Sequence, residues 1–336
     1  MKEVISKVTQ GMDLTVEETK RAMNIMLSGE ATQAQIGAFL TALRMKGETI
    51  DEIVGAATVV REKAEHIAPI VKDGRFADCV GTGGDGYATF NISTTTSFVV
   101  AAAGLPVAKH GNRAFSSKSG AADVLEALGV NIILPPERVE KSVEEIGIGF
   151  MFAQTFNKSM KHVGQARGEI GIRTIFNVLG PLSNPSGSKY QLVGVYNPML
   201  TEPLAKAMSK MGVVSAMVVS GEDGMDEISL SCPTFVSEIK DGEVKSYQIT
   251  PEQFGFKTVD YKEIQGGDAK ENAQITRDIL SGQKGAKRDI VLFNAGATLY
   301  VGKVVPTIEE GIKLAAETID SGKAMEKLSQ LIAFNA

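Results

Sequence analysis

The chain has 336 residues, enough for about two domains, and its 43% hydrophobic and 22% charged residues are ordinary for a globular enzyme. The net charge of −5 argues against general nucleic-acid binding, because phosphate backbones attract basic surfaces. No apolar run approaches the ~20 residues of a membrane span, no signal-peptide core follows Met1, and Cys79 and Cys232 are isolated. We therefore expect a cytoplasmic protein that binds neither membranes nor nucleic acids.

Residues 1–70 are expected to form a small helical domain. Thr15, Thr32 and Thr49 each precede a Glu or Gln by three positions, the pattern of a capping box at a helix start. Apolar residues follow the first two boxes with i, i+3, i+4, i+7 spacing, which gives each helix one buried face. Gly29 and Gly47 are expected to end these two helices.

From about residue 76, short apolar runs alternate with amphipathic segments, which predicts a mostly parallel sheet flanked by helices. The fold class is therefore α/β, with a larger domain at residues 71–336. Helices from about 157–185 are expected to join the small domain, and the chain from Asp268 is expected to be helical. Strands are expected at residues 76–80, 107–109, 132–134, 150–152, 192–195, 217–219, 235–239 and 244–248, the last two forming a hairpin.

Three motifs follow predicted strands or open a predicted helix. Residues 81–85 read Gly-Thr-Gly-Gly-Asp, residues 91–94 read Asn-Ile-Ser-Thr, and residues 109–113 read Lys-His-Gly-Asn-Arg. Backbone N–H groups of a glycine turn and of a helix N-terminus favour anions, and Lys and Arg add full charges. The motifs predict a site for a multiply phosphorylated ligand.

Gly81, Gly83 and Gly86 also fit the G-x-G-x-x-G pattern of dinucleotide-binding folds. Residues 87–90 intervene before any helix, however, and the next strand ends in a basic pair instead of the acidic residue that holds a ribose. The basic strand end favours phosphate over a nicotinamide cofactor.

Asp226 and Glu227 are adjacent carboxylates after a predicted strand, and they fit either a magnesium site or a solvated acidic turn. Beside a polyanion they favour magnesium, because a cation between carboxylates and phosphates removes their repulsion. Arg167 and Arg173 could each bind a planar carboxylate, or each could be an ordinary surface arginine. Residues 116–120 open a helix and fit a second phosphate site, plain N-capping, or both.

Together with residues 171–177 and 180–185, these motifs resemble the anthranilate phosphoribosyltransferase family over nearly the whole chain. The resemblance implies a fold of the phosphoribosyltransferase and nucleoside phosphorylase type, and a homodimer formed through the helical domain. It implies two Mg²⁺ ions per subunit and transfer of phosphoribose from phosphoribosyl pyrophosphate to the amine of anthranilate. The products would be N-(5-phosphoribosyl)anthranilate and pyrophosphate, in tryptophan biosynthesis.

The resemblance also implies residue roles. Acceptor-binding residues would be Gly81, Asn112 and Arg167, and metal ligands would be Ser93, Asp226 and Glu227. No residue is assigned as catalytic, and His110 is the candidate. Donor-binding residues would be Gly81, Gly84, Asp85, Thr89, Asn91, Ile92, Ser93, Thr94, Lys109, His110, Gly111, Asn112, Arg113, Ala114, Phe115, Ser116, Ser117 and Ala121.

Two departures from the family pattern are visible. Residues 154–158 read Gln-Thr-Phe-Asn-Lys where relatives often read Pro-x-x-His-Pro. This difference affects the expected entry channel of the acceptor and not the donor site. Ala121 stands where a serine is common, which removes one hydrogen bond near the phosphates.

Two other functions fit the same architecture. A pyrimidine nucleoside phosphorylase would not need the acidic pair, and a nucleic-acid-binding relative would carry a basic surface.

Overall fold

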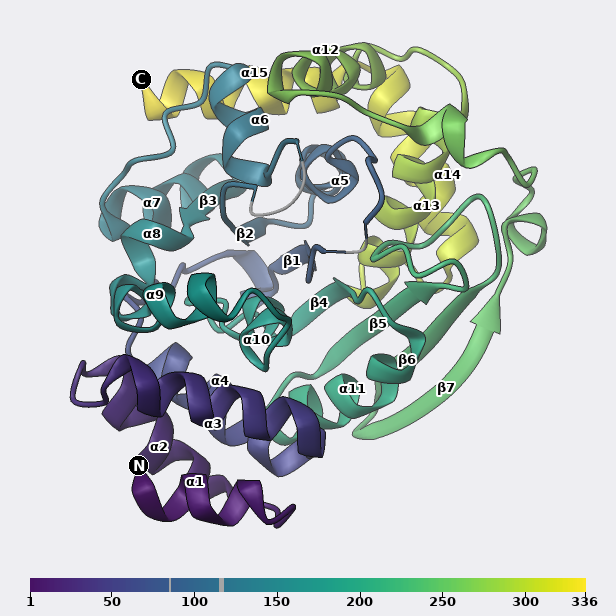
Figure 1. Cartoon of the computed structure of the whole chain (residues 1–336). Helices are drawn as coiled ribbons and strands as arrows, with labels where there is room; N and C mark the ends of the chain where they lie inside the picture. Colours follow the sequence, from purple (N-terminus) through teal and green to yellow (C-terminus); the bar gives the residue numbers. More distant parts are fainter. Residues whose placement is uncertain (85, 115–117) are drawn as a thin grey trace.

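The computed structural model describes residues 1–84, 86–114 and 118–336, and Figure 1 shows a helical bundle below a larger α/β body. The bundle contains α1 (Lys2–Thr9), α2 (Val16–Leu27), α3 (Gln33–Lys46) and α4 (Ile50–Glu62). The three predicted capping boxes are present at Thr15, Thr32 and Thr49. In each, the Thr hydroxyl and the Glu or Gln side chain satisfy N–H groups of the first turn, which sets where the helix begins.

The sheet of the described chain has the strand order β3-β2-β1-β4-β5-β6-β7. Strands β1 to β5 run parallel, whereas β6 and β7 form the predicted antiparallel hairpin. The bounds are β1 (Ala77–Gly81), β2 (Val107–Gly111), β3 (Ile148–Phe152), β4 (Tyr190–Gly194), β5 (Ser215–Gly221), β6 (Thr234–Lys240) and β7 (Glu243–Ile249). The carboxyl ends of the parallel strands meet at one edge, the place where ligands bind in such sheets.

The remaining helices cover the sheet (Figure 1). Along β4, Leu192 packs with α5, α13 and α15 on one face, and Val193 packs with α11 and the bundle on the other. The bounds are α5 (Ile92–Ala102), α6 (Ala121–Ala127), α7 (Pro136–Ile146), α8 (Ala153–Phe156), α9 (Lys161–Ile170), α10 (Phe176–Leu182), α11 (Thr201–Lys210), α12 (Ala269–Leu280), α13 (Ala286–Val301), α14 (Ile308–Asp320) and α15 (Lys323–Asn335). Short 3-10 helices lie at Lys72–Gly74, Lys158–Met160, Pro198–Leu200, Pro251–Phe254 and Tyr261–Ile264.

Helices α9 and α10 pack against the bundle although they lie about a hundred residues after it in the chain. Helix α9 contacts α2 and α3, and α10 contacts α4 and β1. One wall of the region above the sheet therefore comes from the helical side of the molecule. None of the helices in the described residues is long and apolar enough to cross a membrane.

The strand predicted at residues 132–134 is wrong. The Asn131 side chain accepts a hydrogen bond from the backbone N–H of Ile133 at 3.1 Å, and Pro135 follows closely. The Ile133 side chain is 65% exposed. An N–H taken by a local side chain is not available for a strand ladder, so this apolar run forms an extended link between α6 and α7.

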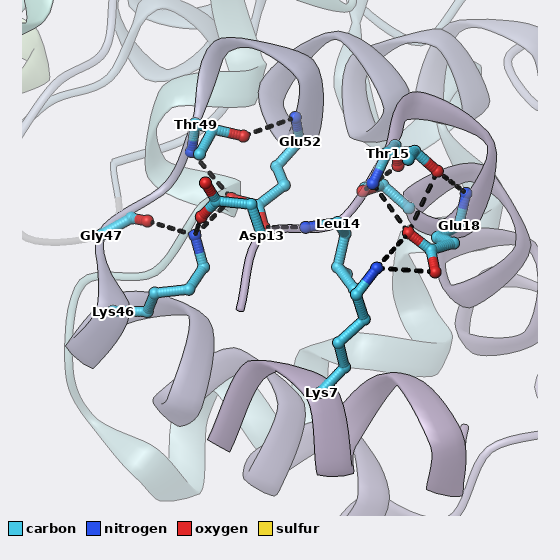
Figure 2. A network of polar contacts seen from close by, with 10 residues as sticks. Lys7, Asp13, Leu14, Thr15, Glu18, Lys46, Gly47, Thr49 and Glu52 are labelled. Atoms are coloured by element: carbon cyan, nitrogen blue, oxygen red, sulfur yellow. Dashed lines mark hydrogen bonds and ion pairs between the residues drawn. The ribbon is translucent and has the colours of Figure 1, made fainter. Parts of the chain in front are cut away.

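A polar network fixes the bundle (Figure 2). The fully buried Glu52 accepts hydrogen bonds from Leu14 N at 2.9 Å, Thr49 N at 2.7 Å and Lys46 Nζ at 2.9 Å. Burial opposes the charge of Lys46, but hydrogen bonds to Asp13 and Glu52 outweigh it and raise the pKa of this lysine. One carboxylate thus joins the loop before α2, the end of α3 and the start of α4.

We expect Glu52→Ala to destabilise the protein by about 3 kcal/mol, because it leaves the Leu14 and Thr49 N–H groups without their acceptor and removes one of the two carboxylates that bind Lys46. The measurement is the midpoint of urea unfolding followed by circular dichroism. Glu17→Ala is the matched control, since Glu17 is 79% exposed and lies 3.9 Å from Lys20. Equal midpoints for the two variants would show that the network contributes nothing.

Candidate active site

The site lies where the loop after β5 packs directly on the ends of β1 and β4. The strand residues at this contact are Gly81 and Gly194, which have no side chains. A Cβ atom on Gly81 would lie 2.2 Å from Asp226 Oδ2, and one on Gly194 would lie 1.6 Å from the Asp226 carbonyl oxygen. Both positions therefore require glycine. This close packing places Asp226 directly beside the glycine turn.

Two backbone N–H groups bind the acidic pair. Gly83 N donates to Asp226 Oδ2 at 2.7 Å, and Ser93 N, in the first turn of α5, donates to Glu227 Oε1 at 3.1 Å. The pair and the Ser93 hydroxyl offer the hard oxygen atoms that Mg²⁺ prefers, and a magnesium ion keeps several waters, so few protein ligands suffice. This donor set fits magnesium, although no group of three His, Cys, Asp or Glu side chains able to hold a metal occurs among the described residues.

Lys109 is buried in the middle of β2, and its side chain reaches across β1. Its Nζ donates to the Cys79 carbonyl oxygen at 2.5 Å and to Ser93 Oγ at 3.3 Å. The lysine charge therefore lies at the start of α5, where the helix N-terminus also favours anions.

His110 is held in a buried, neutral state. Asn157 Nδ2 lies 3.0 Å from His110 Nε2, and the nearby Gly180 backbone favours the protonated ring. Burial lowers the pKa of His110 to about 4, and the Gly180 contact offsets this only in part. The ring is therefore uncharged at neutral pH.

Asn184, in the motif at residues 180–185, ties the end of α10 to the strands. Its fully buried Nδ2 donates to Asp78 Oδ2 at 2.6 Å and to the Ala108 carbonyl oxygen at 2.9 Å. Burial raises the pKa of Asp78 to about 6, although the charge of Lys109 and the Asn184 hydrogen bond lower it in part. This contact gives the motif a structural role that the sequence did not reveal.

The segment after β2 folds back on α6 through Asp123. Asp123 Oδ2 accepts from Ala114 N at 2.9 Å and from Gly120 N at 2.8 Å. Arg113 pairs with Asp123 at 3.0 Å and with Glu126 at 2.5 Å, so in this structure its guanidinium is bound by carboxylates.

Asn91, just before α5, is fixed by Ser119 and by Asn272, of which the sequence analysis pointed only to Ser119. Its Oδ1 accepts from Ser119 Oγ at 3.1 Å and from Asn272 Nδ2 at 3.0 Å, while its Nδ2 donates to the Ser119 carbonyl oxygen at 3.1 Å. Asn272 is 181 positions away, and an ordinary Asn inside an amphipathic helix gives no signal of this contact.

Two adjoining cavities occupy this region. The smaller, of about 420 Å³, contains Lys109, Asp226 and Glu227 in its wall, and the larger, of about 710 Å³, contains Asn157 and Phe176. All described candidate residues line one or both: Gly81, Gly84, Thr89, Asn91, Ile92, Ser93, Thr94, Lys109, His110, Gly111, Asn112, Arg113, Ala114, Ala121, Arg167, Asp226 and Glu227. The candidates Asp85, Phe115, Ser116 and Ser117 lie outside the described residues.

Arg167, on α9, contributes a cation to both cavities. Its guanidinium lies 5.1 Å from the centre of the Phe176 ring, and burial alone lowers its pKa, with no carboxylate among the described residues to offset this. Arg173 differs, because it donates to the Gly84 carbonyl oxygen and lies over the Tyr196 ring at 4.1 Å. Arg167 is therefore the arginine suited to a ligand.

Comparison with known proteins shows similarity over both parts of the chain. Residues 2–64 match the glycosyl transferase family's helical bundle domain, and residues 73–325 match its a/b domain. An anthranilate phosphoribosyltransferase of Acetivibrio thermocellus is 55% identical over 334 residues, covering 99% of this chain and 96% of that protein.

Solved structures agree over the full length. The anthranilate phosphoribosyltransferase of Thermus thermophilus has a TM-score of 0.93 and 41% identity, covering 98% of each chain. The Saccharomyces cerevisiae enzyme in complex with PRPP and Mg has a TM-score of 0.91 and 30% identity, covering 99% of this chain and 96% of that one. The chain therefore belongs to the anthranilate phosphoribosyltransferases, within the glycosyl transferase family whose helical and a/b domains it carries.

Proposed function

We propose that this protein transfers the phosphoribosyl group of phosphoribosyl pyrophosphate to the amine of anthranilate, in tryptophan biosynthesis. One observation carries the proposal: a cavity with the glycine turn, Lys109 and the acidic pair adjoins a cavity that contains the half-buried cation of Arg167. The first suits a polyanionic donor, and the second suits an aromatic carboxylate.

The reaction breaks the bond between the ribose carbon and the pyrophosphate oxygen, and the electron pair leaves with pyrophosphate. The amine lone pair forms the new C–N bond, and the nitrogen then loses a proton. An aromatic amine is neutral at pH 7, so no base is needed before the attack. Lys109, the N-terminus of α5 and the glycine-turn N–H groups supply fixed positive potential where pyrophosphate charge develops, and positioning supplies much of the rate.

Magnesium would neutralise charge on the leaving pyrophosphate. We propose two ions per subunit, held by Ser93, Asp226 and Glu227 together with donor phosphates and water. The N–H groups of Gly83 and Ser93 orient the two carboxylates. The acidic pair also favours this function over a nucleoside phosphorylase, whose free phosphate needs no such pair.

Replacing both Asp226 and Glu227 with Ala should abolish turnover and weaken Mg²⁺-dependent donor binding by more than ten-fold, because the cation would lose its protein ligands. Turnover is measured as loss of anthranilate fluorescence with phosphoribosyl pyrophosphate, and donor binding by calorimetry. Glu222→Ala removes an exposed carboxylate from the same loop and should leave both unchanged. Full activity of the double variant in the presence of a chelator would refute the metal assignment, and no turnover by the parent protein would refute the function.

Arg167→Ala should raise the KM for anthranilate about ten-fold or more, since a hydrogen bond to a charged group contributes roughly 1.5–3 kcal/mol. The KM for the donor should change much less. Aniline has no carboxylate, so it should be a poor acceptor for the parent and lose little more in the variant. An equal penalty for aniline and anthranilate would mean that Arg167 does not bind the carboxylate.

We propose that residues 1–70, with the helices from residues 157–185, form the dimerisation domain of a cytoplasmic homodimer. Support comes from an exposed row on α3, formed by Ala34, Ala38 and the 83% exposed Met45. Cys79 and Cys232 are free thiols, as in a reducing compartment. Cell fractionation tests the compartment, and recovery outside the cytoplasm would refute it.

Met45→Glu should weaken the dimer, because a charge would be buried in the contact. Light scattering coupled to size exclusion measures the mass, for which one chain is 35.7 kDa. Met199→Glu, at an 80% exposed position in the 3-10 helix before α11, serves as the control. A monomeric parent protein would exclude the proposed assembly.

A further inference from the structure

Asn157 belongs to the segment that departs from the family pattern, and it lies in the wall of the larger cavity. Its backbone is fixed, because Asn157 N donates to Ala153 O at 2.7 Å and Asn157 O accepts from Met160 N at 3.1 Å. The residue is 6% exposed. A side chain held this firmly has a defined direction.

The position of the His110 proton decides which end of the Asn157 amide faces the ring. The Gly180 backbone raises the pKa of His110, as a carbonyl oxygen near a ring N–H does, so we place the proton of the neutral imidazole on the ring nitrogen that faces Gly180. Nε2 faces Asn157 and is therefore an acceptor. Asn157 must present Nδ2 to the ring, which leaves its Oδ1 on the other side.

Asn157 Oδ1 is buried and has no hydrogen-bond partner among the described residues. A buried acceptor without a donor costs free energy, and a ligand donor in the cavity would remove that cost. Anthranilate has one kind of donor, the N–H groups of its amine. Its carboxylate and ring can offer Asn157 none.

We propose that Asn157 orients the acceptor amine: Oδ1 accepts one N–H of anthranilate while Nδ2 is held by His110. The inference rests on the proposed function and deepens it. The ortho carboxylate takes the other N–H within the substrate, and Arg167 holds that carboxylate. An amide oxygen does not take up a proton at neutral pH, so Asn157 is a positioning residue that fixes the direction of the amine lone pair.

Salicylate tests this, because it is nearly isosteric with anthranilate but its single O–H is bound to its own carboxylate. We expect the parent protein to bind anthranilate at least ten-fold more tightly than salicylate, and Asn157→Leu to reduce that ratio to within about three-fold. Calorimetry with Mg²⁺ and pyrophosphate present measures both ligands. Gln154→Leu removes another amide from the same cavity wall and should keep the parent ratio.

Equal losses of both ligands in Asn157→Leu would overturn the proposal, since Asn157 would then only support the wall through His110. A parent protein that turns over anthranilate without discriminating against salicylate would overturn this inference alone. A parent protein that forms no product would overturn the proposed function instead.

Nitrogen-15 spectra of the parent protein, which has three histidines, give a test without any variant. We expect His110 to be neutral with its proton on Nδ1 at pH 7. A proton on Nε2 would reverse the Asn157 amide and overturn the proposal.

Discussion

The site depends on the contact between Asp226 and the ends of β1 and β4, which leaves no room for a Cβ atom on Gly81 or Gly194. Because Asp226 lies there, its carboxylate receives the Gly83 N–H, and the next residue, Glu227, receives the Ser93 N–H of α5. The glycine turn, the N-terminus of α5 and the acidic pair are thus joined by hydrogen bonds. A side chain at either glycine would push the acidic loop away and separate the groups that handle charge.

The second wall of the site comes from the helical side of the molecule. Helices α9 and α10 pack on α2, α3 and α4, and they carry Arg167 and Phe176 to the larger cavity. Asn184, just after α10, then donates to Asp78 of β1 and to the Ala108 carbonyl oxygen of β2. Buried polar contacts of this kind resist displacement, because an unpaired group in the interior is costly. The larger cavity is therefore held between the sheet and the helices that pack on the bundle.

Local chemistry made much of the fold predictable. The capping boxes at Thr15, Thr32 and Thr49 set helix starts through contacts only three residues apart, and all three are confirmed. The strand that ends at the glycine turn is also confirmed, whereas the strand predicted at 107–109 continues through the basic pair to Gly111. The run at residues 132–134 is also apolar, but the N–H of Ile133 donates to the side chain of Asn131. An apolar composition alone therefore predicted a strand that does not form.

The sequence by itself determined the class of chemistry. Its glycine turn and acidic pair follow strands and its basic pair lies near the end of one, and parallel strands bring their carboxyl ends together whatever the details of packing. Only the tertiary structure decided how these groups are held. His110 meets Asn157 across 47 positions, and Asn91 meets Asn272 across 181. Such pairs leave no periodic or local signal in one sequence, because the partners are brought together by packing of whole elements and not by the spacing of residues along the chain.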